Sequence, residues 1–175
     1  DITLIKPVYD ENNGKVIFYV ANRGHHADIG GMTPGSAPAN STHVDEEGVL
    51  IDNFKLVSSG KFLESEIHQL LDSGPYPSRN IKQNIADLKA QVAAAEKGAK
   101  ELLTIIDRYG LDVVHAYMQH VQDNAEESVR RILDVLEDTS FTYKMDDGHQ
   151  VSVAIKVDKI NRCATIDFTG TSSQH

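Results

Sequence analysis

The sequence predicts an α+β fold, with antiparallel β-strands at both ends of the chain and a long antiparallel helical hairpin inserted between them. Three observations support this class. Two β-branched and aromatic runs near the start are separated by a turn containing Asn-Gly, a common hairpin signal. Two long central segments repeat apolar residues at helical spacing. Short alternating runs separated by turn residues follow at the end.

The first predicted hairpin pairs residues 2–8 with residues 15–21. Residues 16–20 are all apolar, so we expect the second strand to be covered on both faces. In an antiparallel pair, the start of one strand lies beside the end of the other. The hairpin is therefore expected to bring Asp1 toward His25.

The loop after this hairpin contains the densest group of candidate functional side chains. His25, His26 and Asp28 fall within four positions and lead into a run of glycines and prolines, which predicts a shaped loop. Imidazole and carboxylate groups are common ligands of divalent metals and common acid–base groups near neutral pH. The spacing alone leaves two interpretations open: a metal or catalytic site, and a surface loop with solvated imidazoles.

The middle of the chain is predicted to be mostly helical. Residues 49–57 are expected to form a strand, and residues 61–72 a short amphipathic helix. Apolar spacings of three and four then predict a helix of about 30 residues that ends at Gly110, in which Gly98 marks a close helix contact. A second long helix follows. The core that the two helices are expected to share contains Leu88, Val92, Leu102, Val114, Val121 and Ile132.

The first long helix also carries a polar stripe beside its apolar one. This stripe consists of Asn80, Asn84, Asp87 and Gln91. Solvated helix faces favour lysine and glutamate, whereas short amides suit a wet cleft or a hydrogen-bond network between helices. The sequence leaves both interpretations open.

The last part of the chain, residues 141–145, 151–157 and 163–168, is predicted to form an antiparallel meander. We expect a single domain over residues 1–175, comprising a hairpin and loop (1–60), a helical part (61–138) and the meander (139–175). Strands are already under way at both termini, so we interpret the chain as an internal fragment of a larger polypeptide.

Composition narrows the expected partners. The net charge of −9 leaves no basic stripe for phosphates, so we expect no nucleic acid partner. No apolar run approaches the roughly 20 residues that cross a bilayer, so we expect no membrane partner. The single cysteine, Cys163, excludes an internal disulfide and favours a reducing compartment, and the expected location is cytoplasmic.

Several motifs occur together along the chain: residues 21–31 (ANRGHHADIGG), 34–38 (PGSAP), 47–48 (EG), 84–91 (NIADLKAQ) and 167–171 (DFTGT). Taken together, they resemble the hydantoinase B/oxoprolinase family. Residues 79–80, 91–94 and 109–117 look most like the ATP-dependent 5-oxoprolinases. Two alternatives within the family are N-methylhydantoinase B subunits and the acetone carboxylase large subunit.

The resemblance implies a hydrolase of cyclic amide bonds that serves glutathione metabolism. In such proteins an actin-like half phosphorylates the lactam oxygen of 5-oxo-L-proline with ATP, and the half containing this segment hydrolyses the activated ring to L-glutamate. The implied partners are a small cyclic amide substrate, an ATP-binding hydantoinase A-like domain or subunit, and further copies of the parent in a homo-oligomer. The isolated fragment is expected to be inactive.

The resemblance also implies a divalent metal, with Mn, Mg and Zn left open. Its ligands would be Asp1, as the last residue of a His-x-x-Asp motif whose histidine precedes this sequence, and His25. Asp28 and His26 would be catalytic groups, with Asp28 orienting a ligand imidazole or acting as a base. The candidates for substrate binding are Arg79, Asp87 and Gln91.

A hypothesis of another class is a non-catalytic interaction or scaffold segment. In that interpretation the helical hairpin makes subunit contacts, and the histidine loop is only structural.

Overall fold

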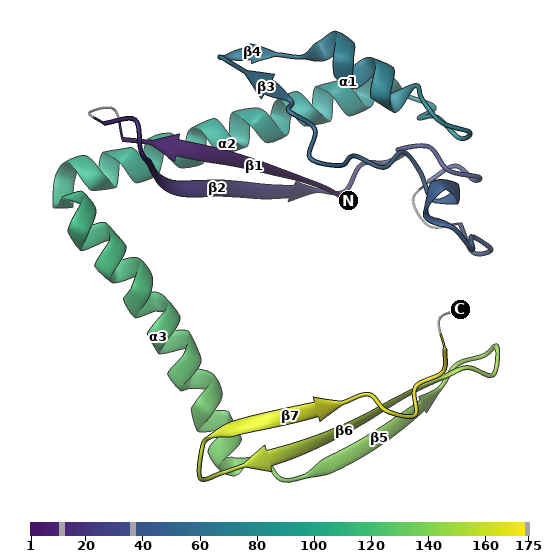
Figure 1. The fold of residues 1–175 in the computed structure, drawn as a ribbon, viewed down its shortest axis with the longest axis vertical. Helices are drawn as coiled ribbons and strands as arrows, with labels where there is room; N and C mark the ends of the chain where they lie inside the picture. Colours follow the sequence, from purple (N-terminus) through teal and green to yellow (C-terminus); the bar gives the residue numbers. More distant parts are fainter. Residues whose placement is uncertain (11–12, 36–37, 174–175) are drawn as a thin grey trace. The chain divides into compact units, whose positions relative to one another are not determined.

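The computed structural model describes residues 1–10, 13–35 and 38–173 and confirms the α+β class, with strands at both ends and a long helical region between them (Figure 1). The chain divides into two compact units, Asp1–Thr104 and Ile105–His175. The helix α2 (Ile81–Tyr109) continues through this boundary. The expected single domain over residues 1–175 stays a prediction.

The first hairpin is confirmed. β1 (Ile2–Tyr9) and β2 (Val16–Gly24) pair antiparallel, with Ile2 opposite Gly24. One face of the hairpin lies along α2 (Figure 1). The two elements approach closely at Gly98, where an added Cβ would lie 3.2 Å from Cγ1 of Val20. Gly98 therefore marks a close contact of the helix, as the sequence predicts, and the partner is a strand of the hairpin.

The other face of the hairpin is exposed. Ile5 and Tyr19, one on each strand, keep 64% and 67% of their surface accessible. The expectation that the second strand is covered on both faces is therefore wrong for the described residues. Residues 16–20 form an apolar run, but apolar composition alone does not determine whether one face or both faces of a strand are covered.

The core of the first unit lies between α1 (Glu64–Leu71) and the first half of α2. Ile67, Leu71, Ile85 and Leu88 are buried there. Burying side chains of this size stabilises a fold by about 1.5–3 kcal/mol each. Partly buried side chains surround this cluster: Ile2, Ile51, Phe54, Leu56, Phe62, Leu70 and Ile81.

The predicted strand over residues 49–57 is wrong except for its last residue. Only Val57–Ser58 (β3) pairs, with Lys61–Phe62 (β4), and α1 begins two residues later. Asn53 has a φ of 48°, which interrupts an extended backbone. Ile51 and Phe54 pack on the core from irregular chain, so this apolar run is satisfied by burial without a strand partner.

The two long helices are confirmed, but not the core assigned to them. α3 (Leu111–Val135) follows α2 after Gly110, which has a φ of 86°. Leu88 and Val114 are buried, whereas Val121 and Ile132 are 67% and 56% exposed. The expected burial of Val121 and Ile132 is therefore wrong. Among the described helices, none is both long enough and apolar enough to cross a bilayer.

The predicted meander is confirmed in the second unit. β5 (Thr139–Lys144), β6 (Gln150–Asp158) and β7 (Cys163–Asp167) form an antiparallel sheet in that order. The motif at residues 167–171 forms a turn after β7. Oδ1 of Asp167 accepts hydrogen bonds from the amide and hydroxyl of Thr169, and Thr171 donates its hydroxyl to the carbonyl of Ser152.

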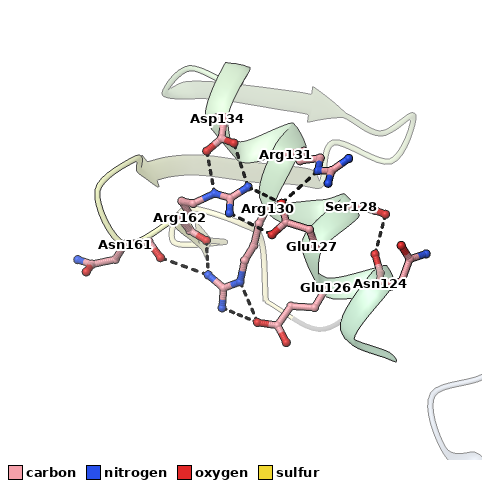
Figure 2. A network of polar contacts seen from close by, with 9 residues as sticks. All are labelled: Asn124, Glu126, Glu127, Ser128, Arg130, Arg131, Asp134, Asn161 and Arg162. Atoms are coloured by element: carbon pink, nitrogen blue, oxygen red, sulfur yellow. Dashed lines mark hydrogen bonds and ion pairs between the residues drawn. The ribbon is translucent and has the colours of Figure 1, made fainter. Parts of the chain in front are cut away.

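A polar network attaches the turn between β6 and β7 to α3 (Figure 2). The Arg162 guanidinium donates to Glu127 at 3.0 Å and to Asp134 at 2.9 Å. Its hydrogen bonds, with those of Arg131, lower the pKa of Glu127 below its ordinary value. Arg130 donates in return to the carbonyl of Arg162 at 2.8 Å. The turn is thus held through both side chain and backbone.

The division between buried and exposed apolar residues is testable by substitution. Leu88→Ala should destabilise the chain by roughly 2–5 kcal/mol, because it leaves a cavity in the α1–α2 core. Val121→Ala is the matched control and should change the stability by less than about 0.5 kcal/mol, because its side chain is exposed. Urea unfolding followed by circular dichroism measures both. Equal losses for the two variants would contradict this assignment of the core.

Candidate functional site

The pairing of β1 with β2 brings Asp1 beside His25, as the sequence predicts. Oδ1 of Asp1 lies 2.8 Å from Nδ1 of His25, and Nε of Arg23 donates to Oδ2 of Asp1 at 2.9 Å. The side chains of Arg23 and His25 are largely exposed to solvent. The three residues form an accessible polar group at the end of the hairpin.

Asp1 and His25 fit part of a metal-ligand set. A carboxylate oxygen and an imidazole nitrogen suit divalent metals, and donors at about 2.0–2.2 Å from one ion lie roughly 3 Å from each other. The 2.8 Å separation of the two atoms is close to that spacing. Residues 1–10, 13–35 and 38–173 hold no group of three or more His, Cys, Asp or Glu side chains placed to bind a metal. The remaining ligands would have to come from outside these ranges.

Asp28, which is expected to orient a ligand imidazole or act as a base, does not form a metal-binding group with Asp1 and His25 among the described residues, and its carboxylate has other partners. Its Oδ1 accepts from the amides of Gly30 at 2.9 Å and Arg79 at 3.3 Å. Its Oδ2 accepts from the amide of Gly35 at 3.3 Å and from the Arg79 guanidinium at 2.9 Å.

These donors also determine the protonation of Asp28. Burial raises the pKa of the carboxyl, but the hydrogen bonds from Gly30, Arg79 and Gly35 outweigh it and hold the pKa below its ordinary value of 3.8. A carboxylate stabilised in this way is a weak base near neutral pH. The contacts favour a role in shaping the loop, and the role of Asp28 as a base stays a prediction.

Arg79, a candidate for substrate binding, joins two parts of this loop. Besides its contacts to Asp28, its Nη2 donates to the carbonyl of Gly31 at 2.6 Å. Part of the guanidinium remains accessible. Arg79 lies two residues before the first residue of α2 and thus couples the start of the helix to the histidine loop.

The loop is shaped by close approaches of backbone to backbone. Gly30 and Gly31 have φ values of 96° and 94°, which favour glycine. A Cβ on Gly30 would lie 2.1 Å from the carbonyl oxygen of Tyr76, and one on Gly31 would lie 2.7 Å from that of Glu47. The prediction of a shaped loop is confirmed for these residues. Ser36 and Ala37, in the motif at residues 34–38, lie outside the described residues.

His26 points inward, unlike its neighbour His25. It is 3% exposed, and its Nδ1 lies 3.2 Å from the amide nitrogen of Asn84. The same nitrogen of Asn84 donates to the carbonyl of Asp28 at 2.8 Å, while its oxygen accepts from the Ser78 hydroxyl. An amide nitrogen only donates, so Nδ1 accepts and Nε2 carries the proton. His26 is therefore assigned as a neutral imidazole, and its catalytic role stays a prediction.

The polar stripe of α2 divides into two pairs. Asn84 and Gln91 are buried and bond to the hairpin and its loop, whereas Asn80 and Asp87 bond along the helix to Gln83. The network interpretation is confirmed for the buried pair, although the network joins a helix to strands and not to another helix. Two further members of this network, Asn22 and Ser78, were not predicted from the sequence. The feature that could have identified them is their position in the sequence, close to the histidine motif and to Arg79.

Comparison with known proteins now defines the class. The family model described as hydantoinase B/oxoprolinase matches residues 1–175, and the chain belongs to this family. The 5-oxoprolinase of Dictyostelium discoideum is 42% identical over 183 residues, which cover 98% of this chain and 14% of that protein. The 5-oxoprolinase 1 of Arabidopsis thaliana is 40% identical over 201 residues, which cover 99% of this chain and 16% of that protein.

A solved structure shows the same fold. The ATP-dependent caprolactamase from Pseudomonas jessenii matches with a TM-score of 0.79 and 27% sequence identity, over 94% of this chain and 28% of that chain. The chain therefore spans less than a third of each of these proteins.

The close approach at Gly30 gives a direct test of the loop. Gly30→Ala and Gly74→Ala both place a side chain at a positive φ, which costs about 1–3 kcal/mol in each case. Gly74 has no described atom within 4 Å of an added Cβ, whereas Gly30 would meet Tyr76. Gly30→Ala should therefore lower the urea midpoint clearly more than Gly74→Ala. A loss no larger than that of the control would show that the loop is not pressed against residue 76.

The lowered pKa of Asp28 predicts a pH-dependent stability. Asp28→Asn should cost about 1–3 kcal/mol at pH 7, because it weakens hydrogen bonds to a partly buried charge. The stabilisation is complete above the unfolded value of 3.8 and is lost as the pH falls through the lowered folded pKa. Urea midpoints of both proteins between pH 7 and pH 2 should therefore converge in acid. Asp107→Asn, on the exposed surface of α2, is the control, and a gap that persists at pH 2 would contradict the assignment.

Proposed function

We propose that the parent of this chain is an ATP-dependent hydrolase of cyclic amides that opens 5-oxo-L-proline to L-glutamate, and that this chain is part of its hydrolytic half. Membership of the family over residues 1–175 supports the class. Identities near 40% to two 5-oxoprolinases favour this substrate over hydantoins or acetone. The likeness to an ATP-dependent caprolactamase supports the use of ATP on a lactam.

The assignment of the site rests on one observation, the 2.8 Å contact between Asp1 and His25 at the accessible end of the hairpin. These two side chains would supply part of the ligand set of a divalent metal, Mn, Mg or Zn. Such an ion lowers the pKa of water and polarises a carbonyl group. Arg23 donates to the second oxygen of Asp1.

Contacts between the loop and the start of α2 hold this end of the hairpin in place. Asp28 and Arg79 fix the backbone that follows His26, and Asn84 fixes the ring of His26 itself. ATP would be used by a hydantoinase A-like domain or subunit, which phosphorylates the lactam oxygen before hydrolysis. The expected homo-oligomer and cytoplasmic location stay predictions.

A second candidate function is an interaction segment within the parent. The apolar stripe of α3 supports it, because Val121, Val129 and Val135 are all more than half exposed. Contiguous exposed apolar residues mark interaction sites in soluble proteins. This role concerns the second unit and is compatible with a site in the first.

Removing the His25 imidazole in the full-length parent should uncouple the two halves of the reaction. His25→Ala weakens the proposed ligand set and leaves the ATP-binding part unchanged. Glutamate formation should then fall by at least about two orders of magnitude, equivalent to ~2.7 kcal/mol in the barrier, while ATP hydrolysis stimulated by 5-oxoproline persists.

Phosphate and glutamate measured in the same reaction decide this prediction. His120→Ala, on the exposed surface of α3, is the control and should leave both products unchanged. If both products fall in parallel in His25→Ala, the assignment of His25 to the hydrolytic step is wrong.

A further inference from the structure

A single buried side chain, Gln91 of α2, joins the two chain segments that carry the proposed ligands. Its Nε2 donates to the carbonyl of Ile2 at 3.0 Å, and its Oε1 lies 3.1 Å from Nε2 of His26. Ile2 directly follows Asp1, and His26 directly follows His25. Gln91 therefore bonds to the immediate neighbour of each proposed ligand.

Both donors and the oxygen of the Gln91 side-chain amide have hydrogen-bond partners at this position. The second proton of Nε2 is donated to Oδ1 of Asn22 at 3.1 Å, and Nδ2 of Asn22 donates in return to the backbone carbonyl of Gln91 at 2.8 Å. The protonated Nε2 of His26, fixed by the contact of Asn84 with the other ring nitrogen, makes the Oε1 of Gln91 an acceptor. The orientation of the amide is thus determined by its partners on both sides.

The space around this amide is also filled. Gln91 is 9% exposed, and a Cβ added to Gly24 would lie 3.1 Å from both Cδ and Nε2 of its side chain. Gly24 precedes His25 and pairs with Ile2 across the hairpin. The end of the hairpin therefore rests directly on the Gln91 amide.

We propose that Gln91 is a positioning residue that fixes the separation of Asp1 and His25 and thereby sets the affinity of this site for a divalent cation. The proposal rests on the proposed function and gives Gln91 a role other than substrate binding, which stays a prediction. Without Gln91, the carbonyl of Ile2 and the Nε2 proton of His26 would lose buried partners, and the strand ends would shift to find others. Residues that orient metal ligands typically change metal affinity 10–100-fold when substituted.

The test measures binding of Mn²⁺ alone to the metal-free, full-length parent by isothermal titration calorimetry. Gln91→Leu should weaken Mn²⁺ binding by 10–100-fold. Gln83→Leu is the matched control on the same helix, because Gln83 is exposed and bonds to Asp87 along the helix, and its affinity should stay within about twofold of the wild type. Hydrogen exchange of the Ile2 and Gly24 amides in the metal-free protein should accelerate in Gln91→Leu and not in the control.

A second variant guards against loss of folding. Gln91→Glu keeps the size of the side chain and the acceptor for His26, but it removes the donors to Ile2 and Asn22. It should also weaken Mn²⁺ binding in a protein whose near-ultraviolet circular dichroism is unchanged. If neither variant folds, Gln91 is a stability residue and the proposal is overturned.

His25→Ala in the same titration separates this proposal from the proposed function. If His25→Ala binds Mn²⁺ as tightly as the wild type, the site itself is misassigned and the proposed function fails with it. If His25→Ala loses Mn²⁺ while both folded Gln91 variants bind it normally, the site stands and the positioning role of Gln91 is wrong.

Discussion

The arrangement of the first unit depends on one constraint, which is that buried side-chain amides must be hydrogen-bonded. Asn84 and Gln91 lie in the interior of α2, where the helix backbone satisfies itself and the side chains must find partners elsewhere. An unpaired buried amide costs about 1–3 kcal/mol. The partners are the ring of His26, the carbonyls of Ile2 and Asp28, and Asn22. The helix thus determines where the hairpin ends and where its loop begins.

This constraint explains why two adjacent histidines have different environments. Successive side chains of extended backbone point to opposite sides, so a His-His pair at a strand end sends one ring inward and the other outward. His26 meets the amides of α2, and His25 meets Asp1 in solvent. The two residues are identical in sequence, but in the fold His26 is buried and His25 remains exposed to solvent.

The parts of the structure that the sequence predicted are those determined by long periodicity or by strand pairing. The length of α2 and the approach of Asp1 to His25 belong to this group. The predicted strand at residues 49–57 and the predicted burial of Val121 were wrong for another reason. An apolar residue favours burial, but the sequence does not show which element, if any, covers it. The choice between cleft and network for the α2 stripe depended on contacts to residues more than 50 positions away, such as Asn84 to His26.

The two carboxylates near the loop differ in the same way as the two histidines. Asp28 accepts from three backbone amides and from the Arg79 guanidinium, and its own side chain is largely buried. Asp1 is held by Arg23 and His25, whose side chains are largely exposed, and exposed ion pairs contribute about 0–1 kcal/mol. Releasing Asp1 from these partners therefore costs little, while releasing Asp28 would leave several backbone amides and the Arg79 guanidinium without their acceptor, at a cost of about 1–3 kcal/mol. Of the two, Asp1 is the carboxylate that can exchange its contacts for a cation, which is why the proposed site lies at the strand ends and not inside the loop.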